Sequence, residues 1–428
     1  MKMDLADKYL SNLVAGDIQR QKAHLTFRGN AKRGRHGWLR LTPAYSLHVV
    51  NEILANTGPN ELILDPFSGT ATTTLASVTR GINAHSVDVN PFLVWLGNLK
   101  LRNFPKTTAD ELLVEARRLR KAASGPGSSW TPNLHQIEKW WDEKTLASLA
   151  DLFAGISNSK ASEPVVDLLK IAFCKVMIAT SNASFGHQSM SFKKAKAVRQ
   201  PQPTLFADFD DSDEPIDLGR MFAEAVDEVA EGLTSETPTA RGEVFLGDSR
   251  HLDKVLKKSA YSTVITSPPY PNRMSYIREL RPYMYWLGFL ESGRQAGEMD
   301  WQAIGGTWGC ATSNLSDWES TNGDVAYPHF NDIVSAISEQ HPLLGKYVHR
   351  YFDDIKLHLQ SLRKVVTPKA RCFYIVGNSK FYDTMLPVEE IYAALFEDAG
   401  FTDVGWKAIR KRNSKKELFE YVVHAIAP

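Results

Sequence analysis

Short apolar runs bounded by turn residues set the pattern of this chain. Such runs are typical of parallel strands that are covered on both faces, and helical patterns follow several of them, for example at 72–79 and 351–366. The runs that predict strands are 62–67, 84–89, 243–247, 263–266, 372–376, 403–409 and 418–426. Strands that alternate with helices predict an α/β fold with a doubly wound, seven-stranded sheet, and the last two strands are close enough to form an antiparallel hairpin.

Two connections between the predicted strands are too long to be plain loops. The first contains helical patterns at 109–123, 134–153 and 165–178, and the second is rich in tyrosine and tryptophan. The predicted domains are a basic N-terminal arm over 1–35, a discontinuous main domain over 36–95 and 241–428, a largely helical insert over 96–240, and an aromatic-rich insert over 271–350 within the main domain.

Composition narrows the class of protein. The chain has 428 residues, of which 43% are hydrophobic, so it can bury a sizeable core. It contains no run of 18 apolar residues and its first ten residues are charged, so we expect neither a membrane span nor a signal peptide, and a cytoplasmic location. Three dispersed cysteines and twelve histidines without metal-ligand spacing predict no disulfide framework and no metal site.

Charge is distributed unevenly, although the net charge is only +1. Residues 1–50 carry nine Lys or Arg against three acids, and residues 91–200 carry sixteen against nine. Residues 201–240 reverse the balance, with one Arg against eleven acids. Basic regions of this kind are able to hold phosphates, and a mixed solvated surface is the plainer interpretation of any single cluster.

Two polar motifs follow predicted strands and carry the candidate chemistry. Thr266-Ser267-Pro268-Pro269-Tyr270 ends the fourth strand; its prolines lack N–H donors, so this edge offers carbonyls, a hydroxyl and an aromatic ring to a planar amine. Asp65-Pro66-Phe67-Ser68-Gly69-Thr70 ends the first strand, where a glycine lets the backbone approach a ligand closely. Taken alone, the segment 65–70 is more often an ordinary turn between a strand and a helix, and the segment 266–270 is also compatible with a strand end capped by a proline turn.

Together these motifs resemble the DNA amino-methyltransferases that depend on S-adenosyl-L-methionine (AdoMet), and most closely their Ser-Pro-Pro-Tyr branch. Val87-Asp88-Val89-Asn90-Pro91 and Gly247-Asp248-Ser249-Arg250 extend the similarity. The resemblance covers the main domain and leaves the inserts out. It implies a Rossmann-like methyltransferase sheet and AdoMet as cofactor. Ala71 departs from the family, which usually has a second glycine at that position.

The resemblance also implies roles for individual residues. Asp65 and its loop would hold the methionine end of AdoMet, Asp88 the ribose hydroxyls and Asp248 the adenine amine, although each acid is also a suitable helix N-cap. Upstream, Thr42 and Tyr45 precede a helical pattern that resembles the family's N-terminal cofactor motif. The cofactor-binding residues predicted in this way are Thr42, Tyr45, Asp65, Pro66, Phe67, Ser68, Gly69, Thr70, Asp88, Asn90, Asp248 and Ser249.

The predicted catalytic residues are Ser267, Pro268, Pro269 and Tyr270. Methylation of cytosine at C5 requires a cysteine nucleophile, and none lies near this motif, so direct attack by an exocyclic amine fits better. We expect Ser267 and the Pro268 carbonyl to orient the amine, while Tyr270 stacks on a flipped base. The Ser-Pro-Pro-Tyr branch favours N4 of cytosine, and N6 of adenine is the alternative because both amines have the same geometry.

We predict double-stranded DNA as the partner, within a restriction–modification system that includes a cognate restriction endonuclease. Candidate contacts to DNA are Lys193, Lys194, Lys196, Arg273 and Arg278, although the two arginines are equally suited to a solvated helix face. An RNA base methyltransferase and a catalytically silent DNA-binding protein remain open alternatives. An NAD oxidoreductase is disfavoured, since no Gly-x-Gly-x-x-Gly follows the first strand.

Overall fold

The computed structural model describes most of the chain. The described residues are 5–9, 25–30, 33–39, 41, 45–122, 130–184, 191–192, 217–235, 237–272, 274–307, 309–412 and 417–428. The chain divides into two compact units. Unit 1 comprises 1–104, 232–284 and 288–428, and unit 2 comprises 105–231 and 285–287.

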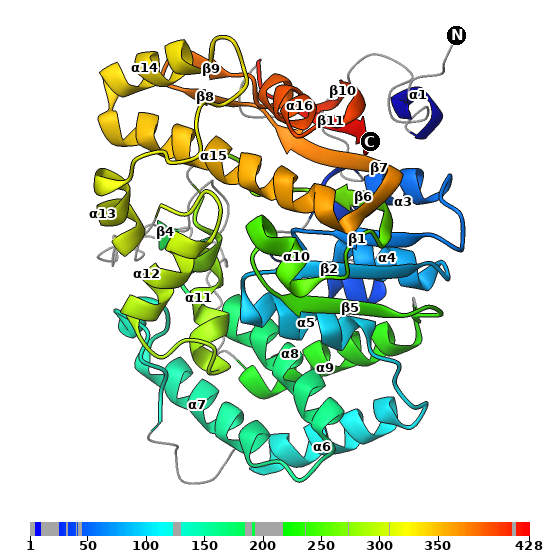
Figure 1. Ribbon diagram of the computed structural model, residues 1–428. Coiled ribbons are helices and arrows are strands. Elements are labelled where there is room, and N and C mark those ends of the chain that lie inside the picture. Colours follow the sequence, from blue (N-terminus) through cyan, green and yellow to red (C-terminus); the bar gives the residue numbers. More distant parts are fainter. Residues whose placement is uncertain are drawn as a thin grey trace, which may run out of the picture. The chain divides into compact units, whose positions relative to one another are not determined.

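Unit 1 contains the seven-stranded sheet that the apolar runs predict, in the order β10-β11-β7-β6-β1-β2-β5 (Figure 1). Its strands are β1 (Leu62–Asp65), β2 (Asn83–Asp88), β5 (Gly242–Leu246), β6 (Tyr261–Thr266), β7 (Val366–Gly377), β10 (Thr402–Lys411) and β11 (Phe419–Ile426). The first five strands are parallel where they pair, whereas β11 pairs antiparallel with both β7 and β10. The sheet is therefore mixed α/β, with β1 and β6 at the point where the strand order reverses.

Alternating side chains explain why helices cover both faces of the sheet. Ile63 and Ile265 join one buried cluster, while their neighbours Leu64 and Val264 join the other. Helices α3 and α4 contribute side chains to the first cluster, and helices α10, α15 and α16 contribute side chains to the second. This is the pattern of a strand that is apolar on both sides.

The helices of unit 1 frame this sheet. They are α1 (Leu5–Tyr9), α3 (Leu47–Leu54), α4 (Thr72–Thr79), α5 (Pro91–Leu101), α10 (Leu252–Val255), α11 (Tyr276–Trp286), α12 (Gly293–Gln302), α13 (Cys310–Asp317), α14 (Phe330–Gln340), α15 (Pro342–Val365) and α16 (Val388–Asp398). The last residues of α11 belong to unit 2. Short 3-10 helices are η2 (Phe27–Asn30), η3 (Gly34–Gly37) and η5 (Ser249–His251), and β8 (Ser379–Phe381) pairs with β9 (Thr384–Leu386).

Unit 2 consists mainly of helices. They are α6 (Thr108–Ala122), α7 (Glu143–Ser157), α8 (Glu163–Ala179), most of α9 (Leu218–Thr234) and the 3-10 helix η4 (Ile137–Lys139), beside the short pair β3 (Ala183–Ser184) and β4 (Ser191–Phe192). The predicted helix at 134–153 begins only at Glu143, because the Asp142 side chain caps it by accepting a hydrogen bond from the Thr145 amide at 2.9 Å.

A buried arginine, Arg35, joins the ends of two helices within unit 1. Its guanidinium donates to the carbonyls of Lys100 and Arg102, at the end of α5, at 2.8 and 2.7 Å. It also donates to the carbonyls of Gly232 and Leu233, near the end of α9, at 3.3 and 3.2 Å. Terminal carbonyls of a helix lack partners within the helix and carry partial negative charge, so a cation stabilises them.

We therefore expect Arg35→Met to lower the free energy of unfolding by about 3 kcal/mol, because it leaves buried carbonyls without donors. Denaturant titration measures this change. Arg33→Met is the matched control, since Arg33 is exposed beside the same 3-10 helix and its loss should change stability by less than about 0.5 kcal/mol. Equal losses in the two variants would contradict the role given to Arg35.

Candidate active site

The loops that follow β1, β2, β5 and β6 meet at the carboxyl edge of the sheet, where they line one cavity of about 300 Å³. Crevices outside the carboxyl ends of parallel strands are the usual ligand sites of such sheets. The predicted site residues that line the cavity are Tyr45, Pro66, Phe67, Gly69, Asp88, Asn90, Asp248, Ser249, Ser267, Pro268, Pro269 and Tyr270.

Other predicted residues lie elsewhere. Asp65, Ser68 and Thr70 are buried behind the cavity wall, and Arg278 is partly buried in α11 without lining the cavity. Thr42, Lys193, Lys194, Lys196 and Arg273 lie outside the described residues. The structure thus brings together the predicted catalytic edge and most of the predicted cofactor-binding residues.

Asp65 orders the loop that lines the cavity. Its carboxylate accepts hydrogen bonds from the Thr266 hydroxyl at 2.6 Å, the Phe67 amide at 3.1 Å and the Tyr45 hydroxyl at 3.4 Å. Burial raises the pKa of Asp65 to about 7, while the hydrogen bond from Thr266 acts in the opposite direction. Asp65 therefore ties the first motif to the strand that carries the second.

The loop after β1 needs left-handed backbone at two positions. Gly69 has φ of 51° and Ala71 has φ of 60°. A residue with a Cβ is disfavoured in this region by about 1–2 kcal/mol, which explains why the resembling family usually has glycine where this chain has Ala71. Ala71 nevertheless adopts this conformation, and its methyl group is fully buried.

Asp88 connects two loops at the cavity. One carboxylate oxygen accepts from the Gly69 amide and the other from the Asn90 amide, each at 2.9 Å. The Asn90 side chain in turn caps α5 by accepting from the Phe92 amide. Burial raises the pKa of Asp88 to about 6, against the effect of these backbone hydrogen bonds. The remaining lone pairs of this carboxylate suit hydroxyl donors of a ligand.

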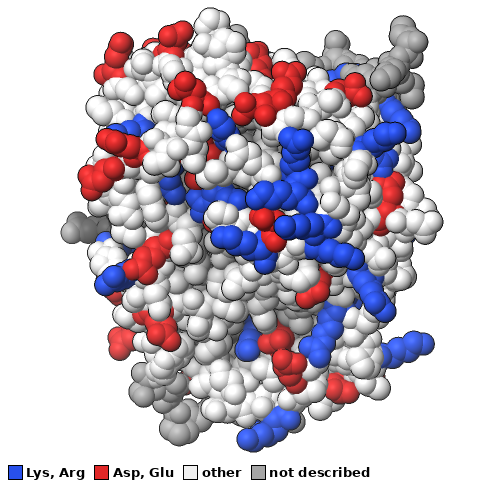
Figure 2. All heavy atoms as spheres, viewed as in Figure 1, with Lys and Arg blue, Asp and Glu red and all other residues white. Residues whose placement is uncertain are grey.

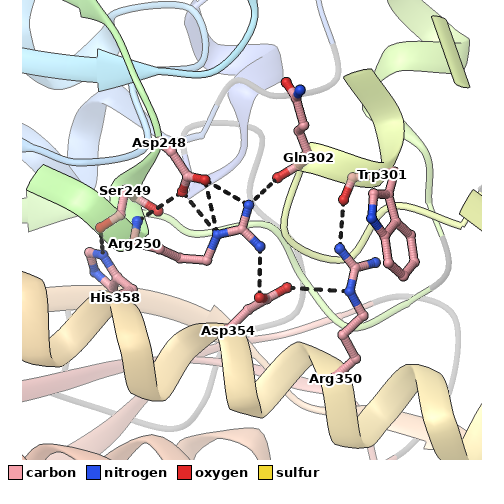
Figure 3. Close-up of polar contacts among 8 residues, drawn as sticks. All are labelled: Asp248, Ser249, Arg250, Trp301, Gln302, Arg350, Asp354 and His358. Atoms are coloured by element: carbon pink, nitrogen blue, oxygen red, sulfur yellow. Dashed lines mark hydrogen bonds and ion pairs between the residues drawn. The ribbon is translucent and has the colours of Figure 1, made fainter. Parts of the chain in front are cut away.

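Asp248 follows β5 and faces the same cavity. The Arg250 guanidinium contacts both of its oxygens, with Nε at 3.0 Å from each (Figure 3). Burial opposes ionisation of Asp248, but the hydrogen bonds and charge of Arg250 prevail and lower its pKa. Asp248 is thus an ionised acceptor at one end of the cavity.

The predicted catalytic edge, residues 267–270, presents acceptors. Ser267 Oγ donates to the Ile375 carbonyl at 3.1 Å and also interacts with the Tyr270 hydroxyl, so one lone pair of Oγ is left to accept from a ligand. The Pro269 carbonyl accepts from the Tyr351 hydroxyl at 2.7 Å. Among the described residues, none donates a hydrogen bond to the Pro268 carbonyl, and Pro268 lines the cavity.

Tyr270 is held by the C-terminal hairpin. Its hydroxyl donates to Glu420 at 2.9 Å, and Arg410 pairs with Glu420 at 2.6 and 2.8 Å. Arg412 lies 5.7 Å from the ring centre, and a Cβ on Gly377 would come within 2.8 Å of the ring. The ring is therefore fixed by its hydroxyl and packed close to Gly377 and Arg412.

His358 supports this site, although no local sequence motif predicts it. His358 contacts the Ser249 carbonyl through Nδ1 at 3.1 Å and the Tyr374 hydroxyl through Nε2 at 2.7 Å, and its ring centre lies 4.8 Å from that of Phe67. Because a carbonyl only accepts, Nδ1 carries the proton, and burial lowers the pKa of His358 to about 4, which keeps it neutral. No local motif signals a partner that is more than one hundred residues away.

Exposed cations gather on one part of unit 1. Figure 2 shows Lys and Arg gathered over α10 and the end of α15, where Lys254, Lys257, Lys258, Arg363 and Lys364 are exposed.

Within the described ranges, His, Cys, Asp and Glu form no group able to hold a metal ion. Nor does any helix in those ranges have the length and apolar character needed to cross a membrane.

Comparison with known proteins finds distant similarity to methyltransferases. The type II methyltransferase M.BsoBI of Geobacillus stearothermophilus is 20% identical over 98% of this chain and 89% of the relative. M.MvaI of Kocuria varians is 19% identical over 78% and 74%, and M.AvaI of Nostoc sp. is 24% identical over 62% and 56%. No family model matches the chain.

Among solved structures, the rRNA methyltransferase aviRa of Streptomyces viridochromogenes aligns with a TM-score of 0.29 and 12% identity, over 91% of this chain and 88% of that one. That score is too low to carry an argument about fold. The sequence relatives support an AdoMet-dependent methyltransferase.

If Asp88 binds the ribose hydroxyls of AdoMet, as the resemblance implies, its pKa predicts how AdoMet binding depends on pH. An ionised Asp88 accepts hydroxyl donors better than the acid does, so affinity should fall as the pH drops below about 6 and approach a tenfold loss for each further unit. Calorimetric titration of the protein with AdoMet between pH 5 and pH 8 measures this dependence.

Asp88→Asn supplies the control. It should weaken binding by about tenfold or more at pH 8 and remove the transition near pH 6. A transition that persists near pH 7 in this variant belongs to Asp65, whose pKa lies at about 7. If the variant keeps the complete pH dependence of the wild type, Asp88 is not the group that titrates.

Proposed function

We propose that this protein is a DNA methyltransferase that transfers the methyl group of AdoMet to the exocyclic N4 amine of cytosine in double-stranded DNA. One observation carries the proposal. The acidic groups Asp88 and Asp248 and the acceptor edge 267–270 line a single cavity, so a cofactor and a target amine would meet there.

The cofactor end of the cavity fits the polar groups of AdoMet. Asp88 is suited to the ribose hydroxyls and Asp248 to the adenine amine, while Gly69 lets the loop approach the methionine moiety. When bound, AdoMet supplies the electrophilic methyl group. The protein residues bind and orient the reactants.

The catalytic edge orients the attacking amine. An exocyclic amine is a poor nucleophile because its lone pair is delocalised into the ring. Since the Ser267 hydroxyl proton is directed to the Ile375 carbonyl, Oγ accepts one amine hydrogen, and the Pro268 carbonyl accepts the other. These two hydrogen bonds draw the nitrogen towards tetrahedral geometry and aim its lone pair at the methyl group, so catalysis rests on alignment and electrostatics. The N–C bond would form as the bond between the methyl group and sulfur breaks, which would leave S-adenosylhomocysteine as product and release one amine proton to water.

A base inside a duplex cannot reach this edge, which forms part of a cavity wall. The proposal therefore includes flipping of the target base out of the helix, with Tyr270 as the aromatic surface against which it stacks. Anchoring of the Tyr270 hydroxyl by Glu420 fixes the ring before the base arrives, which lowers the entropy lost on binding.

Cytosine at C5 is disfavoured as the target. None of the three cysteines is among the described residues that line the cavity, and burial raises the pKa of Cys372, the cysteine on β7.

The relatives named above are type II methyltransferases, which supports a role in a restriction–modification system with a cognate endonuclease as partner. Exposed cations over α10 and α15 provide positive potential for phosphates.

Incubation of the protein with methyl-labelled AdoMet and unmethylated DNA tests the proposal. We expect label in the DNA, and nucleoside analysis should recover it as N4-methylcytosine. Recovery as N6-methyladenine would keep the reaction and change the base. Label in RNA alone, or in neither nucleic acid, would contradict a DNA methyltransferase.

Ser267→Ala should reduce kcat by about 100-fold, because the amine loses one acceptor in the transition state, and should leave the KM for AdoMet within about twofold. Ser262→Ala is the matched control, since Ser262 lies on β6, the strand that Ser267 follows, and bonds to Glu61 instead of lining the cavity. Equal effects of the two substitutions would show that the loss arises from the strand and not from the amine contact.

A further inference from the structure

Arg250 connects three parts of unit 1 at the cofactor end of the cavity (Figure 3). Besides its contacts with Asp248, it donates through Nη1 to Asp354 of α15 at 2.7 Å and through Nη2 to the Gln302 carbonyl at 2.8 Å. Its side chain is only 15% exposed. A planar guanidinium is suited to this task because its N–H donors point in fixed, divergent directions.

A second arginine continues the network. Arg350 lies 3.8 Å from the other oxygen of Asp354 and donates to the Trp301 carbonyl at 2.6 Å, with its guanidinium 3.5 Å from the centre of the Trp301 ring. The carbonyls of Trp301 and Gln302 end α12, where partial negative charge accumulates. Two arginines bridged by one carboxylate therefore hold the end of this helix (Figure 3).

The held segment forms part of the cavity wall. Gln302, Ala303 and Ile304 line the cavity together with Asp248 and Ser249. Without Arg250, the Asp248 carboxylate would lose the contacts that engage both of its oxygens, and the Gln302 carbonyl would lose a donor. Arg250 thus fixes two pieces of the wall relative to each other.

The same helix also contacts the segment that follows the catalytic edge. Asp300, which is fully buried in α12, accepts a hydrogen bond from the Ser275 hydroxyl at 2.5 Å. Ser275 lies between Met274 and Tyr276, which both line the cavity a few residues after Tyr270. A continuous set of contacts therefore leads from Asp248 through Arg250 and α12 to the target side of the cavity.

We propose that Arg250 is a positioning residue that shapes the adenosine end of the site and, through α12, couples cofactor binding to DNA binding. This inference rests on the proposed function. A cofactor bound between Asp248 and the 302–304 segment stabilises the position of α12. Because α12 contacts Ser275, the cofactor also stabilises the position of the 274–276 segment on the target side of the cavity. By linkage, each ligand then strengthens the binding of the other by the same factor.

Arg250→Lys is the informative variant, because lysine keeps the charge but cannot contact Asp248, Asp354 and the Gln302 carbonyl together. We expect it to weaken the binding of S-adenosylhomocysteine, the product that remains after AdoMet has lost its methyl group, about tenfold. The KM for AdoMet should rise by a similar factor, while kcat falls less than about threefold. Arg294→Lys is the matched control, since Arg294 lies on α12, the helix whose end Arg250 holds, in an exposed pair with Glu298 and should change neither constant.

Coupling is measured as the ratio between two affinities for long PCR-amplified DNA duplexes, one with and one without sinefungin. Sinefungin is a non-reactive AdoMet analogue. The wild type should bind DNA about tenfold more tightly with sinefungin, and Arg250→Lys should reduce that factor towards one. Arg350→Lys, which leaves the Asp248 contacts intact, should lose coupling but keep most of its affinity for S-adenosylhomocysteine. Thermal unfolding midpoints close to that of the wild type verify that the variants are folded.

The possible failures are distinguishable. Unchanged binding of S-adenosylhomocysteine in folded Arg250→Lys would overturn the positioning role, even if DNA is methylated. Equal DNA affinity with and without sinefungin in the wild type would overturn the coupling. Absence of methyl transfer to DNA by the wild type would instead overturn the proposed function, and the titration with S-adenosylhomocysteine would still test Arg250.

Discussion

The pairing of β1 with β6 is the constraint on which the candidate site depends. Ile63 pairs with Thr263 and Leu64 with Val264, so two segments about 200 residues apart end at the same edge of the sheet. The hydrogen bond from Thr266 to Asp65 then joins the last residues of the two strands. Because a shift of one residue would turn the apolar side chains of either strand to the wrong face, the buried clusters on both sides fix this register.

Two carboxylates, Asp65 and Asp88, also order the loops around the cavity, and this ordering has an energetic cost. Asp65 and Asp88 both have raised pKa values because burial disfavours their charged forms. Each carboxylate nevertheless accepts backbone amides of the loops that it organises. The left-handed backbone at Ala71 adds strain in the same place. Departures of this kind from local preference concentrate at functional sites, where loop geometry matters more than stability.

The sequence predicts the parts of this structure that local chemistry determines. All seven strands of the main sheet come from apolar runs, and the helix at 72–79 has the predicted bounds, since its signals lie within a few residues. The start of α7 was misplaced because a cap at Asp142 prevailed over the hydrophobic pattern. The Arg250 network was not foreseeable, because its partners lie 52 and 104 residues away and are brought together only by packing. Likewise, the motif alone does not indicate that Asp65 faces Thr266 rather than the cavity.

Under the proposed function, the geometry also separates recognition of the amine from recognition of the ring. Ser267 and Pro268 offer only acceptors to the cavity, so they suit any exocyclic NH2, whichever ring carries it. Arg410 and Glu420 also line the cavity, but Glu420 pairs with Arg410 and accepts from the Tyr270 hydroxyl, which makes both residues supports of the proposed stacking surface. Selection of the ring then falls to other wall residues such as Asn272, whose Oδ1 already accepts from the Met274 amide and whose amide N–H donors suit a ring nitrogen or carbonyl. A short motif that determines the reaction is therefore compatible with different bases, because the walls that select the base come from separate segments of the chain.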